Sequence, residues 1–430
     1  MNSVMHDIWK LIFWLCLLGT VYTYFLYPFL LKVLSGIFGR RYRHKTKSIS
    51  LYQLDDNLLP TVTMVVSAYN EAEVLPDKLA NCMSLDYPAD KISFLIGSDG
   101  SDDDTNRILR CLEDERFRTW HSRIRSGKVS MLNRLLKMVT SDIVVFSDAN
   151  TMFHPQAIRN LVYPFAQTDV GCVNGKLELI ADASDIHACQ PEGIYWRYEN
   201  RLKQMESVLG AVPSINGGIF AIRRHLYEEL PEHAVTEDQV LGMRIMVRGY
   251  RCVFAQAARA CESVSSWSGE LRRRIRISAG NFQSLFLVPA ILNPFRGFRR
   301  RGDSGDTNAH NKKLLGSKAS CIDKRLTRIW VSFAFISHKL LRWLVPFFLT
   351  GMLCANVLLA GEAFYGSTLF LQGLFYICGL IGALLTKLGT LPKVLTLPKY
   401  FIAMNAAILL GLARFLMRRQ QTTWAKTPRR

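Results

Sequence analysis

Carboxylate and amide side chains follow three short apolar runs of this sequence. The runs are Thr61–Ser67, Ile92–Gly97 and Ile143–Phe146. The residues after them are, in chain order, Ala68, Tyr69, Asn70 and Glu71, then Asp99 and Asp102, then Asp148 and Asn150. Carboxylates at the ends of strands can bind a divalent cation, and that cation can in turn bind a diphosphate.

Basic residues and a second pair of carboxylates complete this set. Lys128 and the run Arg272–Arg276 could offset the negative charge of a departing phosphate. Glu237 and Asp238 open a stretch with a helical pattern, and a carboxylate there could take the proton of an attacking hydroxyl. Together these residue types predict transfer from a nucleotide-diphosphate donor.

The apolar runs also predict the element that positions these side chains. Each run is short, ends in polar turn residues and precedes a stretch compatible with a helix. This alternation is typical of an α/β fold with a mostly parallel, doubly wound sheet. Ligands of such sheets bind beyond the carboxyl ends of the strands, so we expect the polar residues to converge on one site.

Three other kinds of site are excluded by their missing patterns. The segment around Ser126-Gly127-Lys128-Val129 lacks the first Gly and the final Ser or Thr of a phosphate-binding P-loop. No G-x-G-x-x-G follows a strand, which argues against a dinucleotide fold. No H-E-x-x-H occurs among the nine histidines.

Composition predicts an integral membrane protein. The 430 residues are 49% hydrophobic, which excludes general disorder, and the formal net charge is +19. The apolar residues form long uncharged blocks, Leu11–Leu31, Trp343–Gly361 and Ala363–Thr386. Each block is long enough to cross a bilayer core of roughly 30 Å. We therefore assign the basic charge to contact with anionic lipid and expect no nucleic-acid partner.

Charge and cysteine distribution predict the orientation. The first block is too long for a cleaved signal and meets a basic flank, Arg40–Lys47, so the middle of the chain is expected in the cytosol at the plasma (inner) membrane. The ten cysteines include no C-x-x-C pair, which argues against disulfides or zinc. The expected units are a first membrane helix (1–39), a basic linker (40–60), the cytosolic domain (61–290), a basic loop with an interfacial helix (291–342), two or three membrane helices (343–417) and a basic tail (418–430). Whether 395–417 spans the membrane stays open.

In order and type, these motifs resemble those of membrane-anchored, inverting family-2 glycosyltransferases of GT-A type. This group includes bacterial exopolysaccharide glycosyltransferases and the hyaluronan, chitin and cellulose synthases. The resemblance covers about residues 60–290 and implies a Rossmann-like GT-A domain flanked by transmembrane helices. It also implies a nucleotide-sugar donor, a lipid-linked or glycan acceptor, Mg²⁺ or Mn²⁺, and possible partner proteins of a polysaccharide pathway.

The resemblance also implies roles for individual residues. Ala68-Tyr69-Asn70-Glu71 would line the nucleotide site, Asp99 would contact the base, and Asp102 would lie at the donor. The segment Arg125-x-Gly127-Lys128 with Asn133 would place Lys128 near the donor phosphates. Asp148-Ala149-Asn150 stands where the family has a metal-binding D-x-D, and Thr236-Glu237-Asp238 where its catalytic base lies, with Asp238 as the base. Arg273 and Arg276 would contact the diphosphate.

Two departures from the family pattern shape the prediction. Asn150 replaces the second Asp of D-x-D, and Ile277 replaces the Trp of Q-x-x-R-W, a residue that in processive synthases packs by the acceptor sugar. We therefore expect single addition of a sugar, most simply from a UDP-sugar, rather than processive synthesis of a polymer. A nucleotidyltransferase, which would release diphosphate, and a non-catalytic receptor are further alternatives.

Several residues have a plainer reading beside the functional one. Asn216-Gly217-Gly218 could allow close approach of an acceptor or could form an ordinary turn. Arg272–Arg276 could face lipid, Glu71 could simply open a helix, and Trp267 is expected as a membrane-interface anchor rather than a sugar platform.

Overall fold

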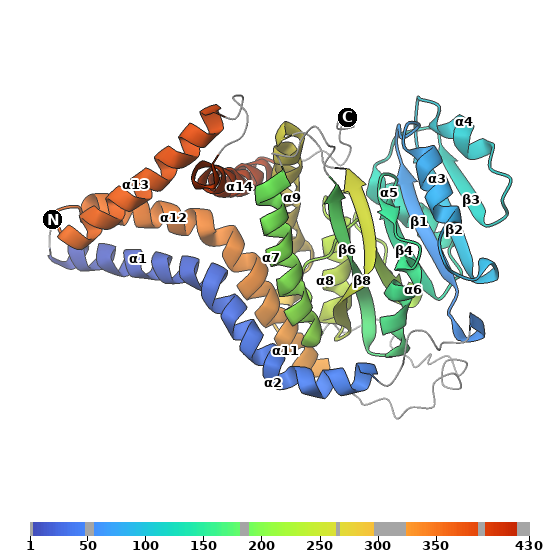
Figure 1. Cartoon of the computed structure of the whole chain (residues 1–430), viewed down its shortest axis with the longest axis horizontal. Helices are drawn as coiled ribbons and strands as arrows, with labels where there is room; N and C mark the ends of the chain where they lie inside the picture. Colours follow the sequence, from blue (N-terminus) through green and yellow to red (C-terminus); the bar gives the residue numbers. More distant parts are fainter. Residues whose placement is uncertain are drawn as a thin grey trace.

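The computed structural model describes residues 3–47, 56–180, 189–263, 267–295, 324–385 and 392–418. An α/β domain lies at one end of the molecule, and long helices extend from it at the other (Figure 1). Much of the predicted basic loop, 296–323, and the tail from 419 lie outside the described residues.

The domain is built on a mixed but mostly parallel sheet. Among the described residues the strand order is β3-β2-β1-β4-β7-β6-β8-β5, and β1, β2, β3 and β4 run parallel. β7 runs antiparallel to both β4 and β6, and the short β5 runs antiparallel to β8. The three predicted strands are confirmed as β1, β2 and β4. The bounds are β1 Val62–Ala68, β2 Ile92–Asp99, β3 Phe117–Ser122, β4 Ile143–Asp148, β5 Met152–Phe153, β6 Val170–Ile180, β7 Phe220–Arg223 and β8 Arg251–Ser263.

Helices cover both faces of this sheet, which explains why its central strands read as continuous apolar runs. On β1, Val65 belongs to one buried cluster, whereas Met64 and Val66 belong to the cluster on the opposite face. Burying each such side chain contributes about 1.5–3 kcal/mol to folding. The helices of the domain are α3 Leu75–Met83, α4 Thr105–Arg110, α5 Lys128–Met138, α6 Ala157–Val162, α7 Cys189–Val208, α8 Glu237–Val247 and α9 Trp267–Leu287.

Within the described residues, four helical segments are long and apolar enough to cross a membrane: Ser3–Gly39, Arg325–Leu358, Ala363–Leu384 and Val394–Leu416. Their surfaces expose large apolar side chains such as Phe25 (70%) and Phe370 (69%), which suits contact with lipid. They consist of α1 Ser3–Val21, η1 Tyr22–Leu26 and α2 Tyr27–Lys47, then α11 Lys324–Ala334, η9 Phe335–Leu340 and α12 Leu341–Leu358, then α13 Ala363–Leu384 and α14 Lys393–Leu416.

Two of these segments differ from the expected bounds. Helix α2 continues to Lys47, so the first part of the predicted linker is helical. The interfacial helix predicted within 291–342 is not a separate helix, because α11, η9 and α12 follow one another without a break. The sequence left open whether 395–417 spans the membrane. All but the last residue of this stretch lie in α14, a single helix of 24 residues.

The long helices pack against one another and against the domain. α1 lies along α12, and α14 lies along both α13 and α9 (Figure 1). Trp267, at the start of α9, packs under α14, where the Lys399 ammonium lies 4.7 Å from the centre of its ring. The α/β domain and the apolar helices therefore share packed helix–helix contacts and are not joined by linkers alone.

Candidate functional site

The turns after β1 and β2 are bound to each other by hydrogen bonds. The backbone N–H of Asn70 donates to Ser101 Oγ, and its side chain exchanges hydrogen bonds with Asp102. The N–H of Glu71 donates to Thr105 Oγ1 at 2.9 Å. Asn70 has a φ of 54°, a conformation that Asn tolerates better than most residues. The predicted nucleotide-binding residues thus form one continuous rim at the carboxyl ends of two parallel strands.

Asp99 positions the next loop. Its carboxylate, 2% exposed, accepts hydrogen bonds from the N–H groups of Ser126 and Gly127 at 2.8 and 2.7 Å. Gly127 has a φ of 93°, which a residue with a Cβ rarely adopts. The Arg125 guanidinium stacks 3.7 Å from the centre of the Tyr69 ring, a cation–π contact that joins this loop to the first turn. The interactions shown for Asp99 are with the protein itself, so its contact with a base stays a prediction.

Lys128 connects two of the predicted carboxylates. Its ammonium donates to Asp148 Oδ1 at 2.7 Å and lies 2.6 Å from Glu237 Oε1. Burial alone would lower the pKa of Lys128, but the two carboxylates more than offset it and raise the pKa above its usual value. Lys128 is therefore a fixed positive charge between the end of β4 and the start of α8.

Asp238 lies in the first turn of α8, beside the loop 213–218. Its Oδ1 accepts a hydrogen bond from the N–H of Gln239 at 2.8 Å. A Cβ added to Gly217 would lie only 2.9 Å from Asp238 Oδ2, so the loop backbone comes close to the carboxylate. Burial and the neighbouring Glu237 raise the pKa of Asp238 to about 6, whereas Lys128 lowers it. A carboxylate with such a pKa is suited to act as a general base near neutral pH.

The basic residues of α9 face this group of carboxylates. Burial lowers the pKa of Arg276, while the charges of Glu237, Asp148 and Asp238 act in the opposite direction. Arg273 lies 3.5 Å from Glu270 and 4.0 Å from Glu262. Tertiary folding thus brings Lys128, Asp148, Glu237, Asp238 and Arg276 together, although they come from four separate segments of the chain.

Other predicted residues are engaged within the protein. The amide of Asn150 donates to Glu262 Oε1 at 3.1 Å. The side chain of Asn216 points away from Asp238, toward Lys203 and Gly175. Of the predicted acceptor segment, it is therefore the backbone at Gly217 that approaches the carboxylate. The acceptor-binding role of Asn216, Gly217 and Gly218 stays a prediction.

Sequence reasoning missed three residues that support the site. Lys78 lies on α3 and is fully buried; it donates to Ser147 Oγ at 2.7 Å and to the carbonyl of Thr151 at 2.6 Å. Because these partners lie on either side of Asp148 in the chain, Lys78 fixes the turn that carries Asp148. Glu262 lies at the end of β8, and Lys203 lies on α7. A single Lys or Glu in an amphipathic stretch gives no signal in one sequence, because most such residues are solvated.

The residues at the end of β4 suit a hard divalent cation. Asp148 would supply a carboxylate oxygen and Asn150 an amide oxygen, and Mg²⁺ or Mn²⁺ held by so few protein ligands would take its remaining ligands from phosphates and water. The described part of the chain contains no group of three or more His, Cys, Asp or Glu side chains that could hold a metal ion. The donor set therefore fits a cation that binds together with a diphosphate.

Comparison with known proteins gives a consistent result. A family model described as glycosyltransferase like family 2 matches residues 60–280, just over half of the chain. Poly-beta-1,6-N-acetyl-D-glucosamine synthase of Staphylococcus aureus (strain COL) is 24% identical over 286 residues, 65% of this chain and 65% of that protein. Probable glycosyltransferase YdaM of Bacillus subtilis (strain 168) is 26% identical over 277 residues, 61% of this chain and 64% of that protein. The chain thus spans just under two thirds of the length of these relatives.

A solved structure shares the fold over nearly the whole chain. Mannosyltransferase PcManGT from Pyrobaculum calidifontis, in complex with GDP-Man and Mn2+, superposes with a TM-score of 0.58 at 21% sequence identity. The match covers 91% of this chain and 99% of that chain. It confirms the predicted GT-A architecture with flanking helices.

Proposed function

Because the chain belongs to glycosyltransferase family 2, we propose that it transfers one sugar, with inversion, from a nucleotide-diphosphate donor to a membrane- or lipid-linked acceptor. The donor is a UDP-sugar, and the product belongs to an exopolysaccharide or another cell-surface glycan. The observation that carries this proposal is the placement of Asp238. A carboxylate whose pKa is raised to about 6 lies against a glycine loop and faces Lys128 and Arg276.

The chain's own residues account for a single displacement. Asp238 takes the proton of the acceptor hydroxyl, whose oxygen attacks the anomeric carbon and forms the new bond. The bond from that carbon to the diphosphate breaks, and its electron pair leaves with the nucleoside diphosphate. Attack from the face opposite the leaving group converts an α-linked donor into a β-linked product.

Fixed charges stabilise the leaving group. Arg273 and Arg276 contact the departing diphosphate, and Lys128 contributes a positive charge held between Asp148 and Glu237. A divalent cation, Mg²⁺ or Mn²⁺, bound at Asp148 and Asn150 would supply further positive charge on the diphosphate. Tyr69, Asn70, Glu71, Asp99 and Asp102 form the rim that binds the nucleotide. Positioning and charge together supply most of the acceleration.

Four long apolar helices and the basic residues of α2 support a location in the plasma membrane, with the catalytic domain in the cytosol. In that orientation the acceptor hydroxyl reaches the site from the inner leaflet. This geometry gives a reason for helices α9 and α14 to pack directly against each other.

Processive synthesis of a β-linked polymer, secreted through the chain's own helices, is the second candidate. The Staphylococcus aureus relative is a poly-beta-1,6-N-acetyl-D-glucosamine synthase, and this similarity favours the second candidate. Ile277 in place of an aromatic residue favours single addition, because it offers no ring to pack against a sugar. The length of the product decides between the two.

The test uses the full chain in lipid nanodiscs that contain an extract of polyprenyl-linked sugars. UDP- and GDP-sugars are offered with Mg²⁺ or Mn²⁺, and release of nucleoside diphosphate is followed beside an Asp238→Asn control. We expect release with one donor and its loss in the control. No release with any donor would overturn the proposed transfer, release of inorganic diphosphate would indicate a nucleotidyltransferase, and undiminished release by the control would refute the role of Asp238.

A further inference from the structure

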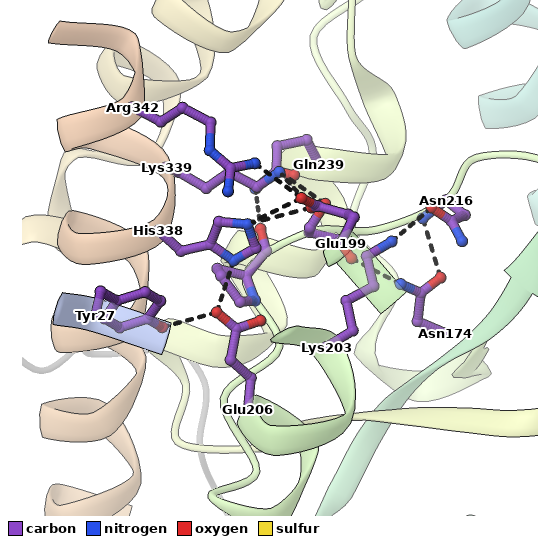
Figure 2. Close-up of polar contacts among 12 residues, drawn as sticks. Tyr27, Asn174, Glu199, Lys203, Glu206, Asn216, Gln239, His338, Lys339 and Arg342 are labelled. Atoms are coloured by element: carbon purple, nitrogen blue, oxygen red, sulfur yellow. Dashed lines mark hydrogen bonds and ion pairs between the residues drawn. The ribbon is translucent and has the colours of Figure 1, made fainter. Parts of the chain in front are cut away.

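A cluster of buried charged and polar residues lies between the domain and the long helices (Figure 2). We call it the junction cluster. It comprises Tyr27 at the start of α2, Glu199, Lys203 and Glu206 on α7, and His338, Lys339 and Arg342 at the join of η9 and α12. Four of its members, Tyr27, Lys203, Glu206 and His338, are at most 1% exposed. Charges buried this deeply are costly unless each has a close partner.

Two carboxylates of α7 bind the candidate membrane helices. Glu206 accepts a hydrogen bond from Tyr27 Oη at 2.8 Å and lies 2.6 Å from His338 Nδ1. Glu199 accepts a hydrogen bond from Arg342 Nη1 at 2.8 Å and lies 3.2 Å from His338 Nε2. Helix α7 is thus fixed to two of the candidate membrane spans.

The cations of the cluster reach the loop 213–218. Lys203 Nζ donates to Asn216 Oδ1 at 2.7 Å, and Lys339 Nζ donates to Ser214 Oγ at 2.7 Å (Figure 2). Asn174 of β6 holds the same loop from the other side, since its side chain donates to the carbonyl of Ser214 and accepts from the N–H of Asn216. The loop is therefore clamped between the sheet and a helix that runs into the membrane.

This clamped loop ends at the carboxylate of Asp238. Gly217 directly follows Asn216, and a Cβ added to it would lie 2.9 Å from Asp238 Oδ2, so the backbone of the loop runs close beside this carboxylate. Gln239, the next residue of α8, donates from Nε2 to the carbonyl of Pro213 at 2.7 Å. Any shift of the loop at Ser214 or Asn216 would change the space in front of Asp238.

Lys203 is a costly residue to bury. Burial lowers the pKa of Lys203 to about 8, with Glu199 and Glu206 acting against the shift. An apolar side chain of similar length would avoid this desolvation, but it would leave the two carboxylates with less compensating charge and Asn216 Oδ1 without its donor. The contact that an apolar side chain could not reproduce is the hydrogen bond to Asn216.

We propose that Lys203 is a positioning residue for the acceptor: through Asn216, and together with Lys339 at Ser214, it fixes the loop 213–218 against Asp238 and ties the loop to the membrane helix. The inference rests on the proposed glycosyl transfer, in which Asp238 is the base. It assigns the junction cluster to presentation of the acceptor and gives it no part in binding the donor.

The test compares Lys203→Met with the parent chain in nanodiscs, using UDP-N-acetylglucosamine and polyprenyl-linked sugars. Met keeps the length of the side chain and removes the donor. We expect the affinity for UDP to stay within about twofold, while the ratio of sugar transfer to hydrolysis of the donor by water falls at least about tenfold. Arg223→Met is the matched control, because Arg223 is a partly buried cation that binds backbone carbonyls at the opposite end of the sheet. It should leave that ratio unchanged.

A double-mutant cycle tests whether Lys203 acts through Asn216. Asn216→Ala should lower transfer, and adding Lys203→Met should lower it by less than about twofold more, since the two residues share one contact. Additive losses, or a loss of UDP affinity equal to the loss of transfer, would overturn the inference. If Lys203→Met does not fold, Ser214→Ala decides, because it removes only the Lys339 contact: a selective fall in the transfer ratio supports the clamp, and an unchanged ratio overturns it. Failure of the proposed function would appear in the parent protein itself, as an absence of UDP release.

Discussion

The substitution Gly217→Ala tests the placement of the base most directly. The new Cβ would lie 2.9 Å from Asp238 Oδ2 and 3.4 Å from Cγ, whereas ordinary contacts of a Cβ begin at 3.4 Å. The atom that must give way is the far end of a side chain, so we expect the fold to survive. The difference between 2.9 and 3.4 Å means that the carboxylate has to move by about half an ångström. Its other oxygen is bound to the N–H of Gln239, so this movement also disturbs that hydrogen bond.

The size of the effect follows from the geometry of proton transfer. A base acts only within hydrogen-bond reach of the proton it takes, and a misplacement of about 1 Å costs about a hundredfold in rate. A half-ångström shift should therefore lower the turnover number for sugar transfer about ten- to hundredfold, which corresponds to about 1.4–2.7 kcal/mol in the activation barrier. Affinity for the nucleotide should not change, since Gly217 belongs to the loop beside the base rather than to the nucleotide rim.

The assay measures nucleoside diphosphate release and labelled product at saturating donor, with UDP affinity measured separately. Gly171→Ala is the control for overpacking: its Cβ would lie 2.7 Å from Ile245 Cγ2 and 2.7 Å from Tyr250 Cβ, in the apolar core. We expect it to lower stability and leave turnover per folded molecule intact. Parent-like turnover in Gly217→Ala would refute the assignment of Asp238 as the base beside this loop.

Four further predictions follow from contacts at the site. Because the pKa of Asp238 is raised to about 6 and a base must be ionised, kcat/KM should fall tenfold per pH unit below about pH 6; a pH–rate profile without that limb would contradict it. The same raised pKa means that the folded chain binds this proton more tightly than the unfolded chain does, so the ionised Asp238 above pH 6 lowers the free energy of unfolding. Asp238→Asn should therefore have a higher Tm than the parent chain at pH 7.5, and the difference in Tm should disappear by about pH 4. Asp99→Asn places an amide N–H against the backbone N–H of Ser126 or Gly127. KM for the nucleotide sugar should therefore rise roughly tenfold, and the free energy of unfolding should fall by about 1.5–3 kcal/mol. An unchanged KM would show that the loop 125–128 does not bind the nucleotide sugar. Asn150→Asp removes the amide donor to Glu262 and adds a carboxylate, so half-maximal binding of Mn²⁺, followed by its electron paramagnetic resonance signal, should need less metal at pH 7.5; weaker binding would exclude Asn150 as a ligand.

The sequence by itself determined the class of fold and predicted which polar residues lie at one edge of the sheet. Strands β1, β2 and β4 are apolar runs because both faces of the sheet are covered, so burial imprints them on the sequence. Strand ends of a parallel sheet meet at one edge, which is why polar residues that follow such runs could be assigned to one site. The long uncharged blocks predicted three of the four candidate spans of the described chain, because a bilayer requires about 20 apolar residues per span.

Only the tertiary structure decided how those residues are used. Asp99 could be predicted as a site residue, but its bonds to Ser126 and Gly127 depend on the pairing of β2 with its neighbours. Lys78 and Lys203 look like ordinary surface lysines in the sequence, and both are buried. Their partners lie 69 and 13 residues away along the chain, and no local pattern encodes such contacts. Periodicity indicates which face of a helix or strand is buried. The pairing of charged side chains from two elements is fixed by packing, because hydrogen bonds and ion pairs form only over a few ångströms in the folded chain.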